Sequence, residues 1–160
     1  GNTAPVMVQP SLQNVFEHQQ LVLTLSATDS DTPAQTLGYS LVSGPSDAAV
    51  SAAGVLTWTP GETDGGTTAF IVVRVTDNGV PPLSHERTVQ VSVTEVNNQP
   101  DLADPGSQNA TEHEQFTLNL AATDSDVPAQ TLTFEKVSGP SGLTVSSAGA
   151  VSWTPGENDG

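Results

Sequence analysis

Short stretches of the chain alternate between core-forming and other residues. In residues 21–27 every second residue is Leu or Ala, and in residues 89–94 every second residue is Val. This period of two is typical of a β-strand with one buried face. Further segments between turn-forming residues complete a set of seven predicted strands. The seven are 14–17, 21–27, 36–42, 48–51, 55–58, 69–76 and 87–96. No segment has helical periodicity, so the sequence predicts an all-β protein.

An internal repeat organises the chain. Residues 1–65 align with residues 96–160 without a gap, and 36 of the 65 aligned pairs are identical. A gapless repeat of this length indicates tandem copies of one domain. Its size is close to the roughly 100 residues of an immunoglobulin-like sandwich. We therefore expect tandem Greek-key β-sandwiches of about seven strands, the first over residues 1–96 and the second over residues 97–160.

The second repeat is expected to be truncated before its last two strands. It contains counterparts of the first five predicted strands, whereas residues 69–76 and 87–96 have no counterpart before residue 160. A sandwich without these strands would expose apolar faces and open edges. The favoured explanation is that the parent chain continues past residue 160, and the alternative is that another chain completes the sheet.

The composition is strongly acidic, with 18 Asp and Glu, only three Lys and Arg, and a formal net charge of -15. Such a surface repels phosphate groups and anionic lipids, so we expect no nucleic-acid partner. It attracts cations, and Ca2+ is the obvious candidate because its ligands are carboxylate and carbonyl oxygens. The alternative is that the acidic residues only keep the protein soluble.

Two further properties narrow the class of protein. The chain has no Cys, which excludes disulfides, thiolate metal sites and Cys nucleophiles. No apolar run approaches the roughly 20 residues of a membrane span, so we expect no membrane insertion in this segment.

Three motifs carry a resemblance to a known family. They are the paired acids Asp29-Ser30-Asp31, the segment 75–81 (VTDNGVP) and the boundary 95–100 (EVNNQP). In this order and spacing, they make the whole chain resemble the cadherin-like superfamily of immunoglobulin-like tandem repeats. Residues 54–60 (GVLTWTP) are more similar to its bacterial branch than to the others.

The resemblance implies that Ca2+ binds where successive domains meet and stiffens the array. In that family the upstream domain, the linker and the paired acids of the downstream domain all contribute oxygens. Carried over to this chain, the junction set is Glu17, Glu62, Glu95, Asn97, Asn98, Asp124 and Asp126. The far end of the first repeat would present Asp29, Asp31 and Asp77, with Asn2, to a preceding domain.

This implied site departs from the family pattern, and a simpler interpretation exists. Asn98 stands where the family usually has Asp, and the two neutral amides of the linker should weaken the site. After the fifth strand, the usual acid cluster is reduced to Glu62, with Asp64 as a second candidate. In the alternative interpretation, Asp29 and Asp31 only form the local hydrogen bonds that Asp often makes in turns.

The aromatic and histidine residues have two interpretations each. We interpret Trp58 and Trp153 as core or inter-strand packing residues, with a sugar-binding platform as the alternative. His18 and His113 occupy matched positions beside Glu17 and Glu112. We interpret both His residues as exposed strand residues, with transition-metal binding as the minor alternative.

The sequence indicates a structural role and no enzymatic activity. It has no Ser-His-Asp order, phosphate-binding loop or His-rich zinc motif, and its paired acids recur at a turn in each repeat. We expect a calcium-stiffened spacer or adhesion repeat of a large secreted or cell-surface protein, of bacterial type. Its expected partners are neighbouring repeats of the same chain, with a cell-surface protein or glycan as a further partner. The alternative is an accessory carbohydrate-binding module of a secreted polysaccharide-degrading enzyme.

Overall fold

The structure is a computed structural model that describes residues 1–159 of the 160-residue chain. Gly160, with which the expected second repeat ends, lies outside the described residues. Contacts within the chain define two compact units, Gly1–Val96 (unit 1) and Asn97–Gly160 (unit 2), and each is described by itself. Apart from two single 3-10 turns, all elements in the described part are strands, which confirms the predicted all-β class. None of the helices among the described residues has the length and apolar character needed to cross a membrane.

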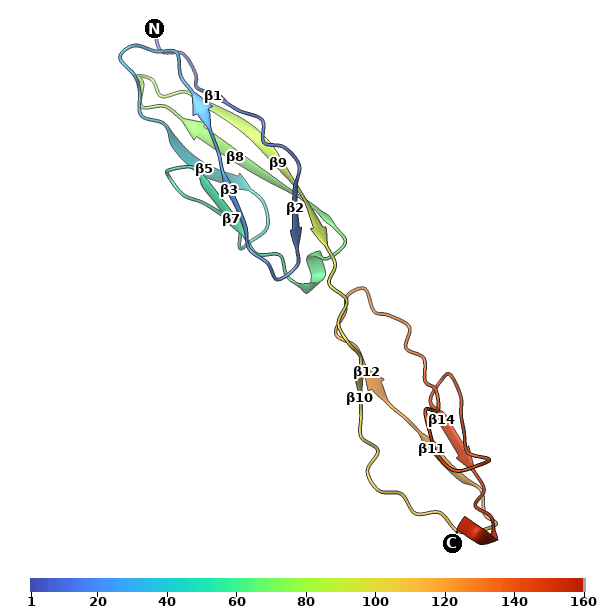
Figure 1. Cartoon of the computed structure of the whole chain (residues 1–160). Helices are drawn as coiled ribbons and strands as arrows, with labels where there is room; N and C mark the ends of the chain where they lie inside the picture. The colour runs from blue at the N-terminus through green and yellow to red at the C-terminus, as the bar shows by residue number, and fades with distance from the viewer. Residues whose placement is uncertain (160) are drawn as a thin grey trace. The chain divides into compact units, whose positions relative to one another are not determined.

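One layer of unit 1 is a four-stranded sheet in the order β2–β9–β8–β5 (Figure 1). Its strands are β2 (Gln13–Phe16), β9 (Ser84–Thr94), β8 (Thr68–Thr76) and β5 (Gly38–Ser43). The two longest strands, β8 and β9, pair antiparallel along their whole shared length, and β5 pairs antiparallel with β8. The short strand β2 runs parallel to β9, with Phe16 aligned with Thr94. This parallel pair brings the ends of two strands far apart in sequence to the same edge of the unit.

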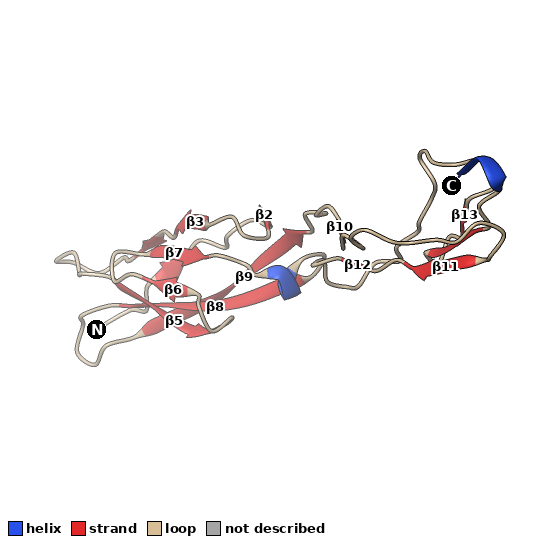
Figure 2. Cartoon of the chain, turned by 90° about the horizontal axis from the view of Figure 1, so that it is seen from below, coloured by secondary structure: helices blue, strands red, loops and turns tan. Residues whose placement is uncertain are grey.

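The other layer of unit 1 consists of shorter strands. β3 (Leu21–Thr24), β7 (Val55–Trp58) and β6 (Ala49–Val50) form a sheet in the order β3–β7–β6. β1 (Val6–Met7) pairs antiparallel with β4 (Ala27–Thr28). A single turn, η1 (Glu62–Asp64), follows β7 and is drawn as the blue ribbon beside β9 in Figure 2.

The core of unit 1 lies between these layers and follows the alternation of the sequence. β8 contributes Ile71, Val73 and Val75, and β9 contributes Val89, Val91 and Val93, all at most 3% exposed. Leu21, Leu56 and Trp58 of the second layer belong to the same cluster of buried residues. Because successive side chains of a strand point to opposite faces, one face of each strand is removed from water.

Trp58 is a core residue. Its side chain is 1% exposed, and its indole Nε1 donates a hydrogen bond to Asp47 Oδ1 at 3.1 Å. A buried Trp normally finds such a partner for its single N–H. The packing interpretation of Trp58 is therefore confirmed, and a sugar-binding platform at this residue is excluded.

The predicted strand 21–27 is two strands in the structure. The chain pairs with β7 as far as Thr24, and Leu25 then donates its backbone N–H to Gly54 O at 2.7 Å. One residue later, Ser26 O accepts a hydrogen bond from Val8, and β4 pairs with β1. The strand changes partner at Leu25 and Ser26, and the alternation of residue types cannot show this because it continues unbroken through the change.

Unit 2 forms the strand pairs that are internal to its described segment. β10 (Asp101–Leu102) pairs with β12 (Ala122–Thr123). β11 (Phe116–Asn119), β14 (Ala150–Trp153) and β13 (Thr144–Val145) form a sheet in the order β11–β14–β13. A final turn, η2 (Glu157–Asp159), corresponds to η1. These pairs repeat those of β1 with β4 and of β3, β7 and β6 in unit 1.

Two strands expected in unit 2 do not form, which corrects the sequence prediction. Residues 109–112 and 131–137, the counterparts of the strands predicted at 14–17 and 36–42, contain no strand. In unit 1 the corresponding strands β2 and β5 pair with β9 and β8, respectively. A strand in water needs a hydrogen-bonded neighbour, and unit 2 has no counterpart of β8 or β9 among its described residues.

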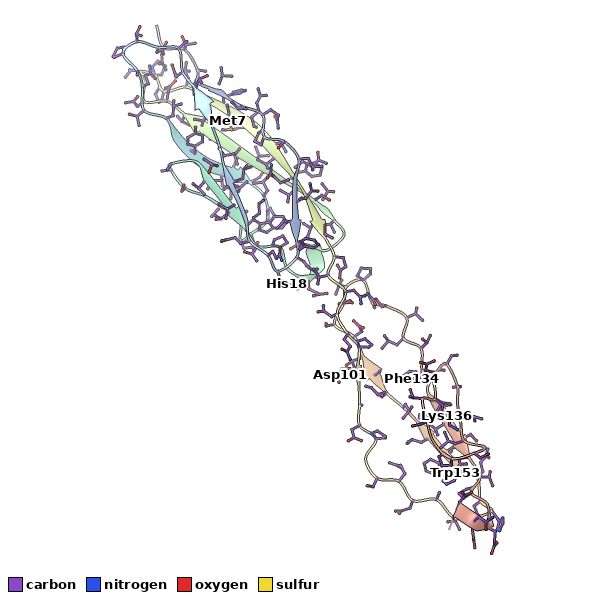
Figure 3. The ribbon with its side chains drawn as sticks, viewed as in Figure 1. Met7, His18, Asp101, Phe134, Lys136 and Trp153 are labelled. Carbon is purple, nitrogen blue, oxygen red and sulfur yellow. The ribbon has the colours of Figure 1, made fainter. Side chains whose placement is uncertain are left out.

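The backbone of unit 2 nevertheless keeps features of the repeat in this region. Phe134 donates its backbone N–H to Ser147 O at 3.0 Å, just as Tyr39 donates to Ala52 O at 3.1 Å in unit 1. Both rings cover a glycine: a Cβ at Gly54 would lie 3.0 Å from the Tyr39 ring, and one at Gly149 would lie 3.1 Å from the Phe134 ring. Figure 3 labels Phe134 in unit 2, as well as Trp153 on β14.

We predict that Leu56→Ala destabilises unit 1 by about 2–5 kcal/mol, because the side chain is fully buried and its loss leaves a cavity. The measurement is urea unfolding followed by Trp58 fluorescence in a Trp153→Phe background. Val22→Ala is the control, since Val22 lies on the paired strand and is 58% exposed. A loss of stability as large for Val22→Ala as for Leu56→Ala would contradict this description of the core.

Candidate functional site

Three glutamates meet at one end of unit 1 and form what we call the carboxylate cluster (Glu17, Glu62 and Glu95). Glu17 directly follows β2 and Glu95 directly follows β9, and these strands run parallel with their last residues aligned. Glu62 begins η1, just after β7. β7 is antiparallel to β3, with Trp58 aligned with Leu21, so its end lies near the turn that follows β2. Long-range strand pairing therefore gathers residues that are separated by up to 78 positions in the sequence.

Glu17 is the most buried member of the carboxylate cluster, with 1% of its surface exposed. Its Oε1 accepts a hydrogen bond from the backbone N–H of Val96 at 3.0 Å. Its Oε2 is buried and has no hydrogen-bond partner among the described residues. A Cβ placed on Gly65 would collide with carboxylate oxygens of both Glu17 and Glu95, so the two side chains converge over this glycine. Burial of a charged oxygen without a partner is costly, which makes Glu17 Oε2 a candidate ligand atom.

His18 lies in a tight turn beside the carboxylate cluster, at the end of unit 1 that carries η1 (Figures 1 and 3). Its backbone has φ 62°, in the left-handed region. Its backbone N–H donates to Pro60 O at 2.7 Å, and its ring Nε2 lies 3.1 Å from Glu62 Oε2. His113 of unit 2 repeats this arrangement, with φ 64°, a bond to Pro155 O and a contact of 3.0 Å to Glu157. The interpretation of both His residues as strand residues is wrong, although both are exposed.

Polar residues at the other end of unit 1 form what we call the amide–carboxylate network (Asn2, Asp29, Asp31, Gln35 and Asp77). Asp29 follows β4 and Asn2 precedes β1, and these strands pair antiparallel, so both residues lie at the same end. Asp29 Oδ1 accepts the backbone N–H of Asp31 at 2.8 Å, which is the local turn bond considered as the simpler interpretation. Asp29 Oδ2 is buried and has no hydrogen-bond partner in the described chain.

Gln35 connects the members of this network, and the sequence analysis did not single it out. Its Nε2 donates to Asp31 Oδ2 at 2.9 Å and to Asn2 Oδ1 at 2.6 Å. Asp31 Oδ2 also accepts the backbone N–H of Thr3 at 2.8 Å. One feature of the sequence could have identified Gln35 as a site residue. It lies in the most strongly repeated segment, where Gln130 is its counterpart.

Asp77 holds the side chain of Asn2 in place through hydrogen bonds. Its Oδ1 accepts the backbone N–H groups of Gly79 and Leu83, and both of its oxygens accept from Asn2 Nδ2 at 3.1–3.2 Å. Burial raises the pKa of this carboxyl, but the hydrogen bonds from Leu83, Asn2 and Gly79 outweigh burial and hold the pKa below its usual 3.8. Asp77 is therefore a buried carboxylate that folding keeps ionised.

Unit 2 repeats the part of this network formed by Asn2, Asp29, Asp31 and Gln35 with its own residues. Asp124 Oδ1 accepts the N–H of Asp126 at 2.9 Å, and Gln130 Nε2 donates to Asp126 Oδ2 at 2.8 Å and to Asn97 Oδ1 at 2.6 Å. Asn98, at the position of Thr3, donates its backbone N–H and its side-chain amide to Asp126. Asp124 Oδ2 is again buried and, within residues 1–159, without a hydrogen-bond partner. Two copies of the sequence thus form one geometry independently.

The structure brings the expected site residues together within each unit. In unit 1 they form two separate groups, the carboxylate cluster and the network that contains Asp29, Asp31 and Asp77. In unit 2, Asn97, Asn98, Asp124 and Asp126 form one group. Asp64 has a different role, because its Oδ2 accepts the backbone N–H of Gly61 at 2.8 Å and closes η1.

The basic side chains make other contacts. Arg74 pairs with Glu86, Arg87 donates to Met7 O, and Lys136 donates to the carbonyl oxygens of Pro140 and Leu143. The acidic groups of both networks are therefore held by neutral N–H donors rather than by ion pairs with Arg or Lys among the described residues. Such donors compensate only part of the repulsion between neighbouring carboxylates.

Comparison with known proteins supports the fold. A family model described as "Bacterial Ig domain" matches residues 2–94, and a second Ig-domain model matches residues 98–160. No curated protein matches the chain. A solved fragment of mouse cadherin-23 (EC22-24) is 22% identical, with TM-score 0.68, and the match covers 98% of this chain and 55% of that chain. Human CDH23 EC21-23 is 20% identical, with TM-score 0.66 and coverage of 96% and 54%, respectively.

A third solved structure, the extracellular domain of protocadherin GammaB4, is 20% identical, with TM-score 0.62. That match covers 100% of this chain and 31% of that chain. The chain thus spans about half the length of the two cadherin fragments, or less for this structure. The predicted cadherin-like, immunoglobulin-like fold is confirmed.

We predict that Asp77 makes unit 1 sensitive to acid. Its pKa is lower in the folded than in the unfolded chain, so its stabilising contribution is present above pH 3.8 and is lost as pH falls through the folded value. The free energy of unfolding should therefore fall less steeply with decreasing pH in Asp77→Asn than in the unchanged chain. The measurement is urea unfolding of unit 1 at a series of acidic pH values.

Glu86→Gln is the matched control for Asp77→Asn, because Glu86 is an acid on β9, next to the strand that Asp77 follows, but is exposed and paired with Arg74. An exposed pair contributes little to stability, so this variant should keep the acid dependence. Identical slopes in Asp77→Asn and the unchanged chain would show that the Asp77 carboxylate is not stabilised by folding.

Proposed function

We propose, because the chain belongs to the bacterial Ig domain family, that it is a non-catalytic structural repeat segment of a large extracellular or cell-surface protein, stiffened by Ca2+. The observation that carries the calcium part is the group of Asn2, Asp29, Asp31 and Gln35 in the amide–carboxylate network, which unit 2 repeats. In each copy one carboxylate oxygen, Asp29 Oδ2 or Asp124 Oδ2, is buried without a hydrogen-bond partner among the described residues.

The residues present fit the chemistry of Ca2+. This ion takes about 6–8 oxygen ligands and accepts carboxylates, amide oxygens and backbone carbonyls together. The ligand candidates in the carboxylate cluster and in both networks are all carboxylate or amide oxygens. A bound cation would also offset the repulsion that Asp29 with Asp31, and Asp124 with Asp126, experience at short range.

The proposed ligands form half-sites in each unit. Asn97, Asn98, Asp124 and Asp126 form the half-site of unit 2, and the carboxylate cluster forms one half-site of unit 1. Asn2, Asp29, Asp31 and Asp77 form the other half-site of unit 1. Asp77 contributes charge and holds Asn2, since both of its oxygens already accept hydrogen bonds.

The carboxylate cluster and the half-site of unit 2 are each proposed to bind Ca2+ through side chains of their own unit. Each half-site alone offers few oxygens compared with the 6–8 or so that Ca2+ prefers, so water would complete the coordination. When bound, Ca2+ would supply charge neutralisation and rigidity, and at about 100 times its Kd it would stabilise the folded state by about 2.7 kcal/mol.

Calorimetric titration of Ca2+ into chelator-treated chain tests the proposal. We expect saturable binding and a rise in melting temperature. In Asp124→Asn/Asp126→Asn the binding at the half-site of unit 2 should be lost and the rise in melting temperature should be smaller, because this half-site loses its two carboxylates. Glu17→Gln should also weaken binding, since the buried Oε2 is proposed as a ligand.

Asp104→Asn/Glu135→Gln is the matched control, because it removes two charges from exposed positions of unit 2. It should leave calcium binding almost unchanged. Absence of heat and of any melting shift in the unchanged chain would overturn the calcium proposal and leave Asp29 and Asp124 as turn residues. Equal losses in the control and in Asp124→Asn/Asp126→Asn would reduce the effect to non-specific attraction by net charge.

A further inference from the structure

A nitrogen ligand that calcium does not use lies beside the carboxylate cluster of unit 1. His18 follows Glu17 in the sequence, and its ring Nε2 lies 3.1 Å from Glu62 Oε2. One carboxylate oxygen of Glu17, one of Glu62 and a ring nitrogen of His18 all lie within 4.8 Å of one another. Three ligand atoms around a tetrahedral ion would be about 3.4 Å apart at ordinary metal–ligand distances, so small side-chain rotations would complete the geometry.

A second observation distinguishes this group from an ordinary acidic surface. Glu17 is 1% exposed, and its Oε2 is buried with no hydrogen-bond partner within residues 1–159. The turn that contains His18 also has an unusual backbone conformation, because this non-glycine residue has φ 62°. Such a backbone is unfavourable for most residues and is often found at functional sites.

We propose that Glu17, His18 and Glu62 bind a transition-metal ion of the Zn2+ class. Imidazole nitrogen with two carboxylate oxygens is a ligand set that suits Zn2+, and three protein ligands leave the fourth position to water. Ca2+ takes oxygen ligands, so His18 gives this site a preference that a purely carboxylate site would lack.

The site shares Glu17 and Glu62 with the proposed calcium half-site. The two ions therefore compete for the same carboxylates, and occupation by Zn2+ withdraws two ligands from calcium. Only this competition rests on the proposed function, whereas binding of Zn2+ stands on the geometry of unit 1 alone.

Unit 2 offers an internal comparison. Glu112, His113 and Glu157 repeat the arrangement, again within 4.8 Å, but all three are exposed. The side chain of Glu157 is 78% exposed, against 26% for Glu62. In the exposed copy, water already solvates the carboxylates, so a metal ion would relieve no desolvation cost there. The metal ion would also have to compete with this water for the carboxylate oxygens. The exposed copy should bind Zn2+ more weakly than the site of unit 1.

The test is calorimetric titration of ZnCl2 into the chelator-treated 160-residue chain, compared with His18→Asn and His113→Asn. Asn tolerates the left-handed backbone, so the turn is kept in both variants. We expect one tight site in the unchanged chain, weakened at least about tenfold in His18→Asn and unchanged in His113→Asn. A histidine side-chain NMR signal that shifts on addition of Zn2+ should likewise belong to His18 first.

Equal affinity in His18→Asn and the unchanged chain, or equal losses in both variants, would overturn the proposal, as would binding only at millimolar Zn2+. Titration of Ca2+ into His18→Asn separates the two proposals, because calcium binding there should match that of the unchanged chain. Zn2+ affinity that falls as Ca2+ is added would establish the competition. Zn2+ affinity indifferent to saturating Ca2+ would overturn the competition and leave the zinc site standing.

Discussion

The hairpin of β8 and β9 is the structural element on which most of unit 1 depends. It supplies six inward-facing residues of the core and the two edges on which β5 and β2 pair. Unit 2 has no counterpart of this hairpin among its described residues, and there the segments 109–112 and 131–137 remain without strand structure. Apart from Gly149 and Pro155, Val151 is the only apolar residue of unit 2 that is buried within residues 1–159. Available partners, rather than local propensity, therefore decide which segments become strands.

The two ends of unit 1 depend on this hairpin to different degrees. The carboxylate cluster needs it, because Glu95 reaches Glu17 only through the parallel pairing of β9 with β2. The bonds among Asp29, Asp31 and Gln35 need only the short β1–β4 pair and a local turn. Unit 2 accordingly forms the equivalent bonds without β8 or β9. The network that is proposed to receive calcium is thus the locally encoded part of the repeat.

Sequence reasoning succeeded where the signal is local or repeated. The strand class, the repeat and the burial of Trp58 are confirmed. It failed where the outcome depends on a distant partner: the segment 21–27 changes sheets at Leu25, and residues 131–137 lack the neighbour that β5 has. Gln35 was missed because a neutral amide in a loop carries no chemical signal by itself, and its contacts with Asn2 and Asp31 appear only in three dimensions.

The sequence by itself determined the period of two, the 95-residue repeat, the acidic balance and the residue types that can bind a cation. These properties can be derived from neighbouring residues or from the direct comparison of two segments. Only the tertiary structure decided that Glu17, Glu62 and Glu95 converge, that Glu17 is buried and that His18 leaves the strand to face Glu62. These outcomes depend on which strands pair, and in what direction. Strand pairing joins residues tens of positions apart, so no local pattern specifies it.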